Sequence, residues 1–402
     1  MRWLLGLASI CLLAGLQGAA QTPPRAMWLW DSSPLLADAG ARRDFFAFCE
    51  RQRIGIVWAQ IATSAGGNGR QVDRAADWKA FVAEAHRRDM KLHALDGDPH
   101  YALRDQHTAA LAIVKAVVAY NATAAPNERF DGIHFDIEPH VLLDWRVPPL
   151  RERLLEAYLE LNARAAAVAH DAGLAYGVDV PFWWPATSHL LGFVDNVGIM
   201  DYRTTATGPD GIIANATGTL QEAERLARPR VHVGVETSVE RGDYLFLLGI
   251  SSEAVHKAIV ERSPSATLLD RHRARLVDDG AAVHVGVKLP GADDTLAEIA
   301  RAFRVAPSRN PDQAAADAQA AFRREGEWLD VRPRMIQPGT ASFAGVSATL
   351  MTPGKVTFAA KPLSEMTREL EQAETAFAGY RSYAGIAIHD YAAFRRLTVG
   401  SP

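Results

Sequence analysis

The chain alternates between short segments rich in β-branched residues and longer amphipathic segments. Apolar side chains that recur every three to four residues are typical of helices, and short runs of Val, Ile and aromatic residues are typical of strands. The helical pattern occurs at residues 73–89, 106–121, 151–171 and 363–380. The strand pattern occurs at residues 26–31, 54–61, 91–96, 131–138, 175–181, 196–202, 230–237 and 383–389.

Strand and helix patterns in alternation predict parallel strands that are joined by right-handed helical crossovers. Eight such strands ordinarily close into a (β/α)8 barrel, the TIM barrel of the α/β class. A doubly wound open sheet is the alternative, but it would need a glycine-rich phosphate loop after the first strand. Trp28-Leu29-Trp30-Asp31 stands at that position, so the sequence favours the barrel.

The interval between the seventh and eighth predicted strands is far longer than a crossover needs, at about 150 residues. We therefore predict that the barrel occupies residues 26–241 and 355–397, with an α+β insertion subdomain at 242–354 between strands seven and eight. Inside the insertion, the pattern indicates a helix at 252–262, a strand at 281–289 and an Ala-rich run at 311–325.

The first twenty residues have the pattern of a cleaved signal peptide. Arg2 precedes an apolar run over residues 3–16, and small residues follow at Gly18 and Ala20. The run is too short to span a bilayer, so we expect no integral membrane segment after cleavage and a secreted or periplasmic protein. Cleavage would remove Cys11 and leave Cys49 alone, so no internal disulfide is expected.

The composition excludes several classes of protein. A chain of 402 residues that is 48% hydrophobic can bury a large core, which argues against disorder and against a disulfide-stapled miniprotein. The net charge of -4 offers no basic surface for a phosphate backbone, so we expect no nucleic-acid partner. The sequence leaves the oligomeric state open.

Polar side chains gather where the predicted strands end. A single Asp after a strand is usually a turn or capping residue. In a (β/α)8 barrel, however, the carboxyl ends of all strands meet at the face where active sites lie, so polar residues at most of them indicate a functional site. These residues are Asp31, Gln60, Asp96, Asp98, Asp136, Glu138, Asp179, Asp201, Glu236, His389 and Asp390.

The fourth predicted strand carries two carboxylates on one face. Side chains alternate along a strand, so Asp136 and Glu138 lie about 7 Å apart on the same side, with His134 behind them. Carboxylates that share an enclosed site raise each other's pKa, so one of them can stay protonated and act as a general acid. The alternative is a buried polar network that only stabilises the barrel mouth.

This strand resembles the strand-four signature of glycoside hydrolase family 18, the chitinase-like enzymes, which reads Asp-Gly-x-Asp-x-Asp-x-Glu. Asp131, Gly132, Asp136 and Glu138 match this pattern, and His134 stands in place of the middle Asp. The family's strand-six motif, Met-x-Tyr-Asp, is matched in part as well. There Met200 and Tyr202 match and Arg203 replaces the Asp. Many members of the family also carry an α+β insertion after strand seven.

The resemblance implies a retaining glycoside hydrolase that needs no cofactor. Glu138 would protonate the glycosidic oxygen, Asp136 would orient the 2-acetamido group of the substrate, and Tyr202 would donate a hydrogen bond to that group. Asp131 would hold the end of the strand.

Two alternatives to this mechanism remain. Glu138 on strand four and Glu236 on strand seven also resemble the acid/base and nucleophile of the clan A retaining hydrolases, although Ile137 stands where those enzymes usually have Asn. The chain could also be a chitinase-like lectin that binds sugar without cleaving it. Such lectins commonly lack the acid, so Glu138 argues against this function.

Aromatic and polar residues at the strand ends are candidates for saccharide binding, because sugars stack on aromatic rings and hydrogen-bond through their hydroxyls. Some of the tryptophans are expected to be core residues instead. The substrate-binding candidates are Trp30, Asp31, Gln60, Asp98, His134, Asp179, Trp183, Asp201 and His389.

A metal site is not expected. His134, Asp136 and Glu138 form a row along one strand, which spans too far for one ion. A Ser–His–Asp hydrolase is not expected either, because the chain has no Gly-x-Ser-x-Gly motif. We therefore predict an exported glycoside hydrolase that acts on an oligo- or polysaccharide, with the sugar, the linkage, endo or exo action and the purpose of the insertion left open.

Overall fold

The computed structural model describes eleven parts of the chain: residues 22–67, 69–142, 145, 148–184, 187–239, 244–250, 267–276, 280–288, 296–305, 343–350 and 353–399. The predicted signal peptide, the predicted helix at 252–262 and the Ala-rich run at 311–325 lie outside the described residues.

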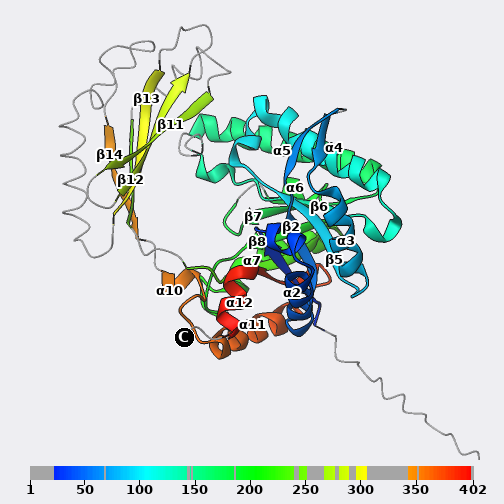
Figure 1. The fold of residues 1–402 in the computed structure, drawn as a ribbon. Helices are drawn as coiled ribbons and strands as arrows, with labels where there is room; N and C mark the ends of the chain where they lie inside the picture. Colours follow the sequence, from blue (N-terminus) through cyan, green and yellow to red (C-terminus); the bar gives the residue numbers. More distant parts are fainter. Residues whose placement is uncertain are drawn as a thin grey trace, which may run out of the picture.

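Eight parallel strands form a closed barrel, which confirms the predicted (β/α)8 architecture (Figure 1). Their order around the barrel is β1-β15-β9-β8-β7-β6-β5-β2, so the first and last strands pair and close the ring. The strands are β1 (Arg25–Leu29), β2 (Ile54–Gln60), β5 (Lys91–Asp96), β6 (Gly132–Phe135), β7 (Ala175–Pro181), β8 (Asn196–Met200), β9 (Arg230–Glu236) and β15 (Tyr383–His389).

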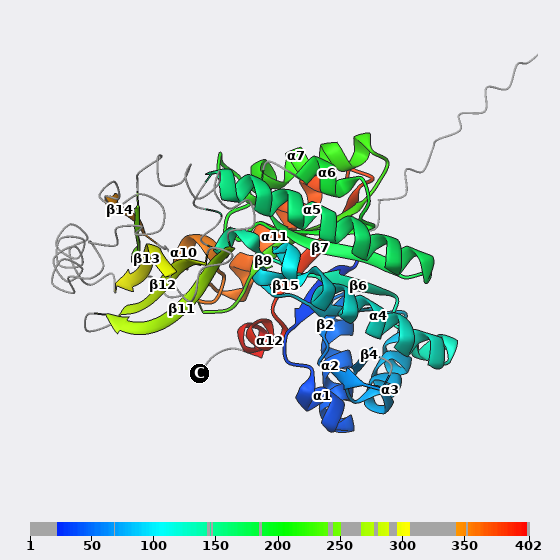
Figure 2. The ribbon, with the colours of Figure 1, turned by 90° about the horizontal axis from the view of Figure 1, so that it is seen from above.

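Helices follow most of the strands and surround the barrel (Figures 1 and 2). The four helical patterns in the sequence correspond to α3 (Ala75–His86), α4 (His107–Thr123), α5 (Pro148–Asp171) and α11 (Leu363–Phe377). Other helices and the hairpin of β3 (Thr63–Gly66) and β4 (Gly69–Val72) were not predicted from the sequence. The missed helices are α1 (Ser33–Ala37), α2 (Ala39–Arg51), α6 (Thr187–Leu191), α7 (Ile212–Arg225), α10 (Pro353–Val356) and α12 (Tyr391–Val399).

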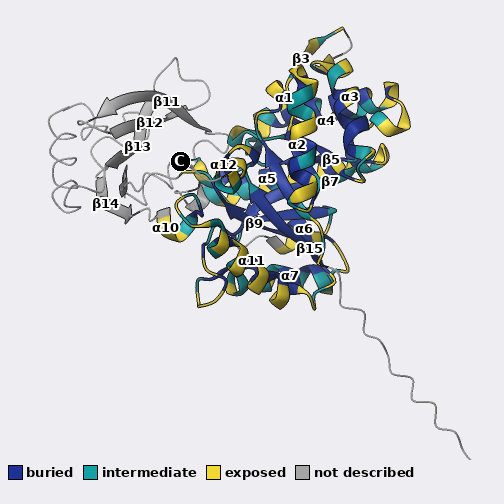
Figure 3. Ribbon diagram, turned by 60° about the horizontal axis from the view of Figure 1, so that its bottom comes forward, coloured by how far each residue is buried: buried dark blue, intermediate teal, exposed yellow. Residues whose placement is uncertain are grey.

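The interior of the barrel contains aromatic and imidazole rings, whereas β-branched aliphatic residues usually fill it. The Trp58 ring stacks on His134 at a centroid distance of 4.0 Å and meets the edge of His232 at 5.4 Å. Trp28 packs edge-on against Trp58 at 4.5 Å. Figure 3 shows the barrel strands as the most deeply buried part of the described chain. Burial lowers the pKa of both histidines to about 3, so these rings are neutral.

Strand β6 ends earlier than the sequence predicts. The predicted strand runs to Glu138, whereas β6 stops at Phe135 and a 3-10 helix begins at Pro139. The Asp136 amide donates to the Asp96 carbonyl, and the backbone there lies so close to Gly97 that a Cβ at that position would stand 1.9 Å from the Asp136 oxygen. Glycine is therefore required at residue 97 to let the backbone of Asp136 cross the end of β5.

The segment between β9 and β15 contains a second, antiparallel sheet, drawn to one side of the barrel in Figures 1 and 2. Its order is β11-β12-β13-β10-β14, and β12 matches the strand predicted at 281–289. The strands are β10 (Tyr244–Ile250), β11 (Thr267–Leu276), β12 (Gly280–Lys288), β13 (Leu296–Val305) and β14 (Phe343–Leu350). Among the described residues, no helix is long and apolar enough to cross a bilayer.

Candidate active site

Glu138 lies at the rim of the barrel with part of its side chain open to solvent. The side chain is 34% exposed, and its Oε1 atom lies 3.7 Å from His140 Nε2. Burial raises the pKa of Glu138, and the charge of Asp179 raises it further, while His389 lowers it. The group is thus both accessible and biased toward its protonated form, as a general acid requires.

Asp136 shares the site with Glu138. Burial raises its pKa well above the usual range for Asp, the charges of Asp179 and Glu138 add to this, and His389 opposes it. Its Oδ1 atom is buried and has no hydrogen-bond partner among the described residues. An acceptor oxygen that the protein leaves unpaired beside a proton donor is suited to bind a polar group of a ligand.

Asp179 lies under these two acids, on β7, and is fully buried. Its Oδ2 atom accepts a hydrogen bond of 2.9 Å from Trp28 Nε1, and its Oδ1 atom lies 2.8 Å from His134 Nε2. A Cβ at position 198 would stand 2.1 Å from the Asp179 Oδ1 atom, so Gly198 on the neighbouring strand makes room for this carboxylate. Burial raises the pKa of Asp179 well above its usual range.

His134, Asp179 and Asp201 were expected to contact the substrate, and the structure does not support this expectation. None of the three has exposed surface. His134 Nδ1 lies 3.2 Å from Asn196 Oδ1, and Asn215 donates to Asp201 Oδ1 at 2.8 Å. Burial raises the pKa of Asp201 to about 7. His134 and Asp179 lie below the strand ends and are covered by the side chains above them. Asp201 instead contacts the outer helix α7 (Ile212–Arg225) through Asn215.

Glu236 was expected to be the nucleophile if the enzyme follows the clan A scheme. The residue is 3% exposed, and its Oε1 atom accepts from the amides of Thr237 (2.8 Å) and Ser238 (2.6 Å) and from Ser238 Oγ (2.7 Å). Its Oε2 atom lies 2.8 Å from His389 Nδ1. Burial alone would raise the pKa of Glu236, but the hydrogen bonds from His389 and Ser238 lower it. This carboxylate is therefore ionised, and both of its oxygens have partners.

His389, at the end of β15, connects this carboxylate to the mouth of the barrel. Trp30 Nε1 donates a hydrogen bond of 2.8 Å to His389 Nε2, and the Tyr202 ring lies 5.8 Å from the imidazole between centroids. Trp30 and Tyr202 are both partly buried. The three rings thus stand together above Trp28, whose ring is 5.6 Å from His389.

Three further substrate-binding candidates lie at the strand ends. Asp31 and Gln60 are exposed, and Asp98 is partly buried. Asp31 accepts from the amide of Ser33 at 3.1 Å, and Asp98 accepts from the amide of His100 at 2.8 Å. Both aspartates therefore cap turns, which is the alternative that applies to any single Asp after a strand.

An aromatic cluster lies beside Glu138. Trp183 is 50% exposed, and its ring stands 5.3 Å from His140 and 6.1 Å from Trp145. Trp145 stacks on Trp184 at 5.3 Å, and both are largely buried. Trp183 was predicted from the sequence as a site residue, whereas His140 was not among the predicted site residues. The signal available was its position two residues after the acid, in the turn that β6 leads into.

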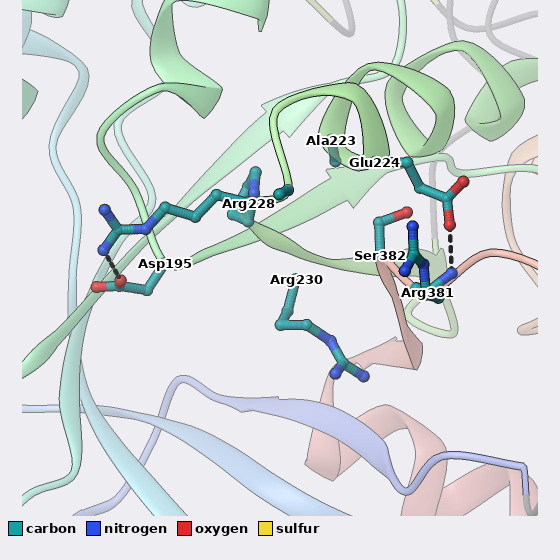
Figure 4. A pocket seen from close by; sticks show the side chains of 9 residues that line it. Asp195, Ala223, Glu224, Arg228, Arg230, Arg381 and Ser382 are labelled. Carbon is teal, nitrogen blue, oxygen red and sulfur yellow. Dashed lines mark hydrogen bonds and ion pairs between the residues drawn. The ribbon is translucent and has the colours of Figure 1, made fainter.

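The described residues contain no group of three or more His, Cys, Asp or Glu side chains arranged to hold a metal ion. Two pockets, of about 320 and 720 Å³, lie at the opposite end of the barrel. Arg230, at the start of β9, and Arg381, just before β15, line both of them. Figure 4 shows the smaller one, in which Arg228 pairs with Asp195 and the Arg381 amide donates to Glu224. None of the carboxylates that cluster at the carboxyl ends of the strands lines this pocket.

No family model matches the sequence, and no curated protein matches it. Solved structures with a similar course of the chain include a chitinase from Bacteroides thetaiotaomicron, with 12% identity, a TM-score of 0.42 and coverage of 92% of this chain and 90% of that chain. They also include a family 18 chitinase from Cycas revoluta in complex with (GlcNAc)3, with 11% identity, a TM-score of 0.41 and coverage of 94% and 96%. A spore cortex-lytic enzyme from Bacillus megaterium has 9% identity, a TM-score of 0.36 and coverage of 92% and 71%. At these values the similarity does not assign the chain to a family.

Proposed function

We propose that the protein is an exported retaining glycoside hydrolase that cleaves an oligo- or polysaccharide, with Glu138 as the general acid and base. The observation that carries the proposal is the position of this carboxyl group. It is 34% exposed at the barrel rim, and its pKa is raised by burial and by Asp179. A partly buried carboxyl group, Asp136, stands beside it, and its buried Oδ1 atom has no partner among the described residues.

In the proposed reaction, protonated Glu138 gives its proton to the glycosidic oxygen as the bond from that oxygen to the anomeric carbon breaks. The acetamido oxygen of the substrate attacks the anomeric carbon from the opposite face and forms a cyclic oxazolinium ion. Asp136 orients the acetamido N–H and stabilises its growing positive charge, and Tyr202 donates a hydrogen bond to the acetamido oxygen. Ionised Glu138 then takes a proton from water, which opens the ring with retained configuration.

The surroundings of Glu236 favour this mechanism over an enzyme nucleophile. A nucleophilic carboxylate needs an oxygen that is free to approach the anomeric carbon. Each oxygen of Glu236 already has partners at 2.6–2.8 Å, and the residue is 3% exposed. We therefore propose a supporting role for Glu236.

The aromatic cluster supports a saccharide as the substrate. Half of the Trp183 side chain is exposed, and the ring contacts His140, which lies within 3.7 Å of Glu138. An exposed indole at this distance from the acid offers a flat surface on which a pyranose ring can stack.

The test is the Glu138→Gln variant, assayed on a panel of glycans with mass-spectrometric identification of the products. We expect turnover to fall by at least about 10³-fold, because Gln keeps the shape of the side chain and cannot donate a proton to the leaving group. Glu156→Gln, on a 70% exposed side chain of α5, is the matched control and should leave turnover unchanged. Unchanged turnover in Glu138→Gln would refute the proposed acid, and tight binding without any product from the unmodified protein would favour a lectin.

Two inhibitor classes separate the mechanisms. Thiazolines mimic the oxazolinium ion and should inhibit competitively if the substrate assists. An activated fluorosugar should trap a covalent adduct only if a carboxylate of the enzyme is the nucleophile. We also expect Asp136→Asn to lower the rate less than Glu138→Gln, because Asn can still accept a hydrogen bond from the acetamido group.

A further inference from the structure

A chain of hydrogen-bonding groups crosses the mouth of the barrel from β9 to the loop after β1. It begins at the amides of Thr237 and Ser238, which donate to Glu236 Oε1. It continues from Glu236 Oε2 to His389 Nδ1 over 2.8 Å and from His389 Nε2 to Trp30 Nε1 over 2.8 Å. Glu236, His389 and Trp30 belong to distant parts of the sequence, so only the closed barrel brings these three side chains together.

The direction of the chain follows from the chemistry of the indole. An indole nitrogen can only donate, so the Trp30 N–H donates and His389 Nε2 must accept. The imidazole therefore carries its proton on Nδ1, where it faces the ionised Glu236. This carboxylate thus fixes the tautomer of the histidine, and the histidine in turn fixes the orientation of the Trp30 ring.

Trp30 is the member that reaches the open site. It is partly buried, whereas Glu236 is 3% exposed. The indole also stands at the edge of the His389 ring, with 6.4 Å between centroids. An aromatic ring held from behind by its N–H presents its face in one orientation, which reduces the entropy lost when a sugar stacks on it.

We propose that Glu236, His389 and Trp30 form a positioning relay that orients the Trp30 indole as a saccharide-binding surface, with Glu236 acting through His389 and not on the sugar. This inference rests on the proposed saccharide substrate and assigns Glu236 and His389 as positioning residues of that site.

The relay is sensitive to pH. Burial alone would lower the pKa of His389, but the hydrogen bond and charge of Glu236, the charge of Asp390 and the charge of Asp136 raise it. Tyr202 on β8 also faces the imidazole, at 5.8 Å, and stays neutral because burial raises its pKa. As the pH falls through the raised pKa, His389 gains a proton on Nε2, two donors then face each other, and Trp30 loses its acceptor. Saccharide binding should therefore weaken toward acid pH.

A double-mutant cycle tests the relay. His389→Ala removes the acceptor, and Trp30→Phe keeps an aromatic ring but removes the N–H. We expect each change to raise the KM of the saccharide about three- to tenfold, as for loss of one neutral hydrogen bond, and the double variant to show no larger increase. Multiplicative effects in the double variant would mean that the two residues act independently and would overturn the relay. His170→Ala, at a His–Asp pair of 2.6 Å on the far end of the barrel, is the control.

The indole N–H signal of Trp30 in a ¹⁵N–¹H NMR spectrum gives a readout that needs no enzymatic activity. Trp30→Phe identifies the signal by its absence. We expect the signal to titrate with the protonation of His389 and to lose this titration in His389→Gln, whose amide oxygen can accept the same hydrogen bond without a charge change. A signal that titrates identically in His389→Gln would overturn the relay.

Glu236→Gln separates the relay from an enzyme nucleophile. The Gln amide would face the Nδ1 proton of His389 donor to donor, so we expect KM to rise as in His389→Ala while turnover persists. Lost turnover together with fluorosugar labelling of Glu236 would overturn the positioning role. If the unmodified protein cleaves no glycan, the proposed function fails, and the NMR titration still decides whether the relay exists.

Discussion

Replacing His232 by Leu tests whether the barrel interior holds neutral histidines as the structure indicates. His232 lies on β9 with 1% of its surface exposed, and neither ring nitrogen has a hydrogen-bond partner among the described residues. Burial, together with the neighbouring His134 and His93, lowers its pKa to about 3. Leu has a similar volume and no polar atoms, so it should fit between the rings with little repacking.

The magnitude follows from proton linkage. In the unfolded chain the histidine binds a proton below its ordinary pKa of 6.5, whereas in the folded barrel it stays neutral down to about pH 3. The unfolded state therefore binds more protons in this window, and the folded state loses stability as the pH falls. The lowered pKa of His232 therefore reduces the free energy of unfolding by about 0.2 kcal/mol at pH 7 and by about 2 kcal/mol at pH 5. A leucine has no such penalty, so the advantage of His232→Leu should grow by about 2 kcal/mol between pH 7 and pH 5.

Urea unfolding, followed by tryptophan fluorescence at pH 7 and pH 5, measures this difference directly. Comparing variant and unmodified protein at each pH cancels the opposing contributions of the buried carboxylates. His100→Leu, at a 47% exposed side chain, provides the control for the same substitution outside the barrel interior. An advantage of His232→Leu that is equal at both pH values would refute the assignment of a neutral, buried imidazole.

Three further outcomes are expected. The rate of hydrolysis should fall as the pH rises through the raised pKa of Glu138, because only the protonated acid can give a proton to the leaving group. A pH profile of kcat checks this, and a kcat that keeps rising through that pH range would contradict the assignment. Gly198→Ala should lower the free energy of unfolding in urea by about 2 kcal/mol or more, because the new Cβ would stand 2.1 Å from Asp179 Oδ1. Gly218→Ala in α7 is the control and should not destabilise the fold, because the space at its Cβ position is open. Trp183→Ala should weaken saccharide binding in calorimetry by about 1 kcal/mol or more with little loss of stability, since the ring is half exposed; unchanged affinity would exclude a stacking role.

The barrel could be predicted from the sequence because its signal is local and repeated. Strands β5, β7 and β15 match the predicted boundaries. Some of the missed elements are short. Helix α12 has only nine residues, and the β3–β4 hairpin has two strands of four. Short elements contain too few turns or alternations for their period to be recognised. Helices α2 and α7 were missed although they have 13 and 14 residues.

The candidate site could be predicted in part. The proximity of Asp136 and Glu138 could be predicted from their spacing along the chain, although β6 stops at Phe135 and both acids lie beyond it. The burial of each residue could not be predicted in this way. His134 and Asp179 were predicted to contact substrate, yet both are fully buried, and Asp179 accepts a hydrogen bond from Trp28 on β1.

Some features follow from residues that are close together along the chain. These features are the alternation of strands and helices, the polar side chains at the strand ends and the pair of acids after β6. The contacts of Glu236 with His389 and of His389 with Trp30 come from the tertiary structure. They join residues that are far apart along the chain, and closure of the barrel fixes the register in which they meet. No local pattern encodes that register, because the packing of all eight strands sets it together.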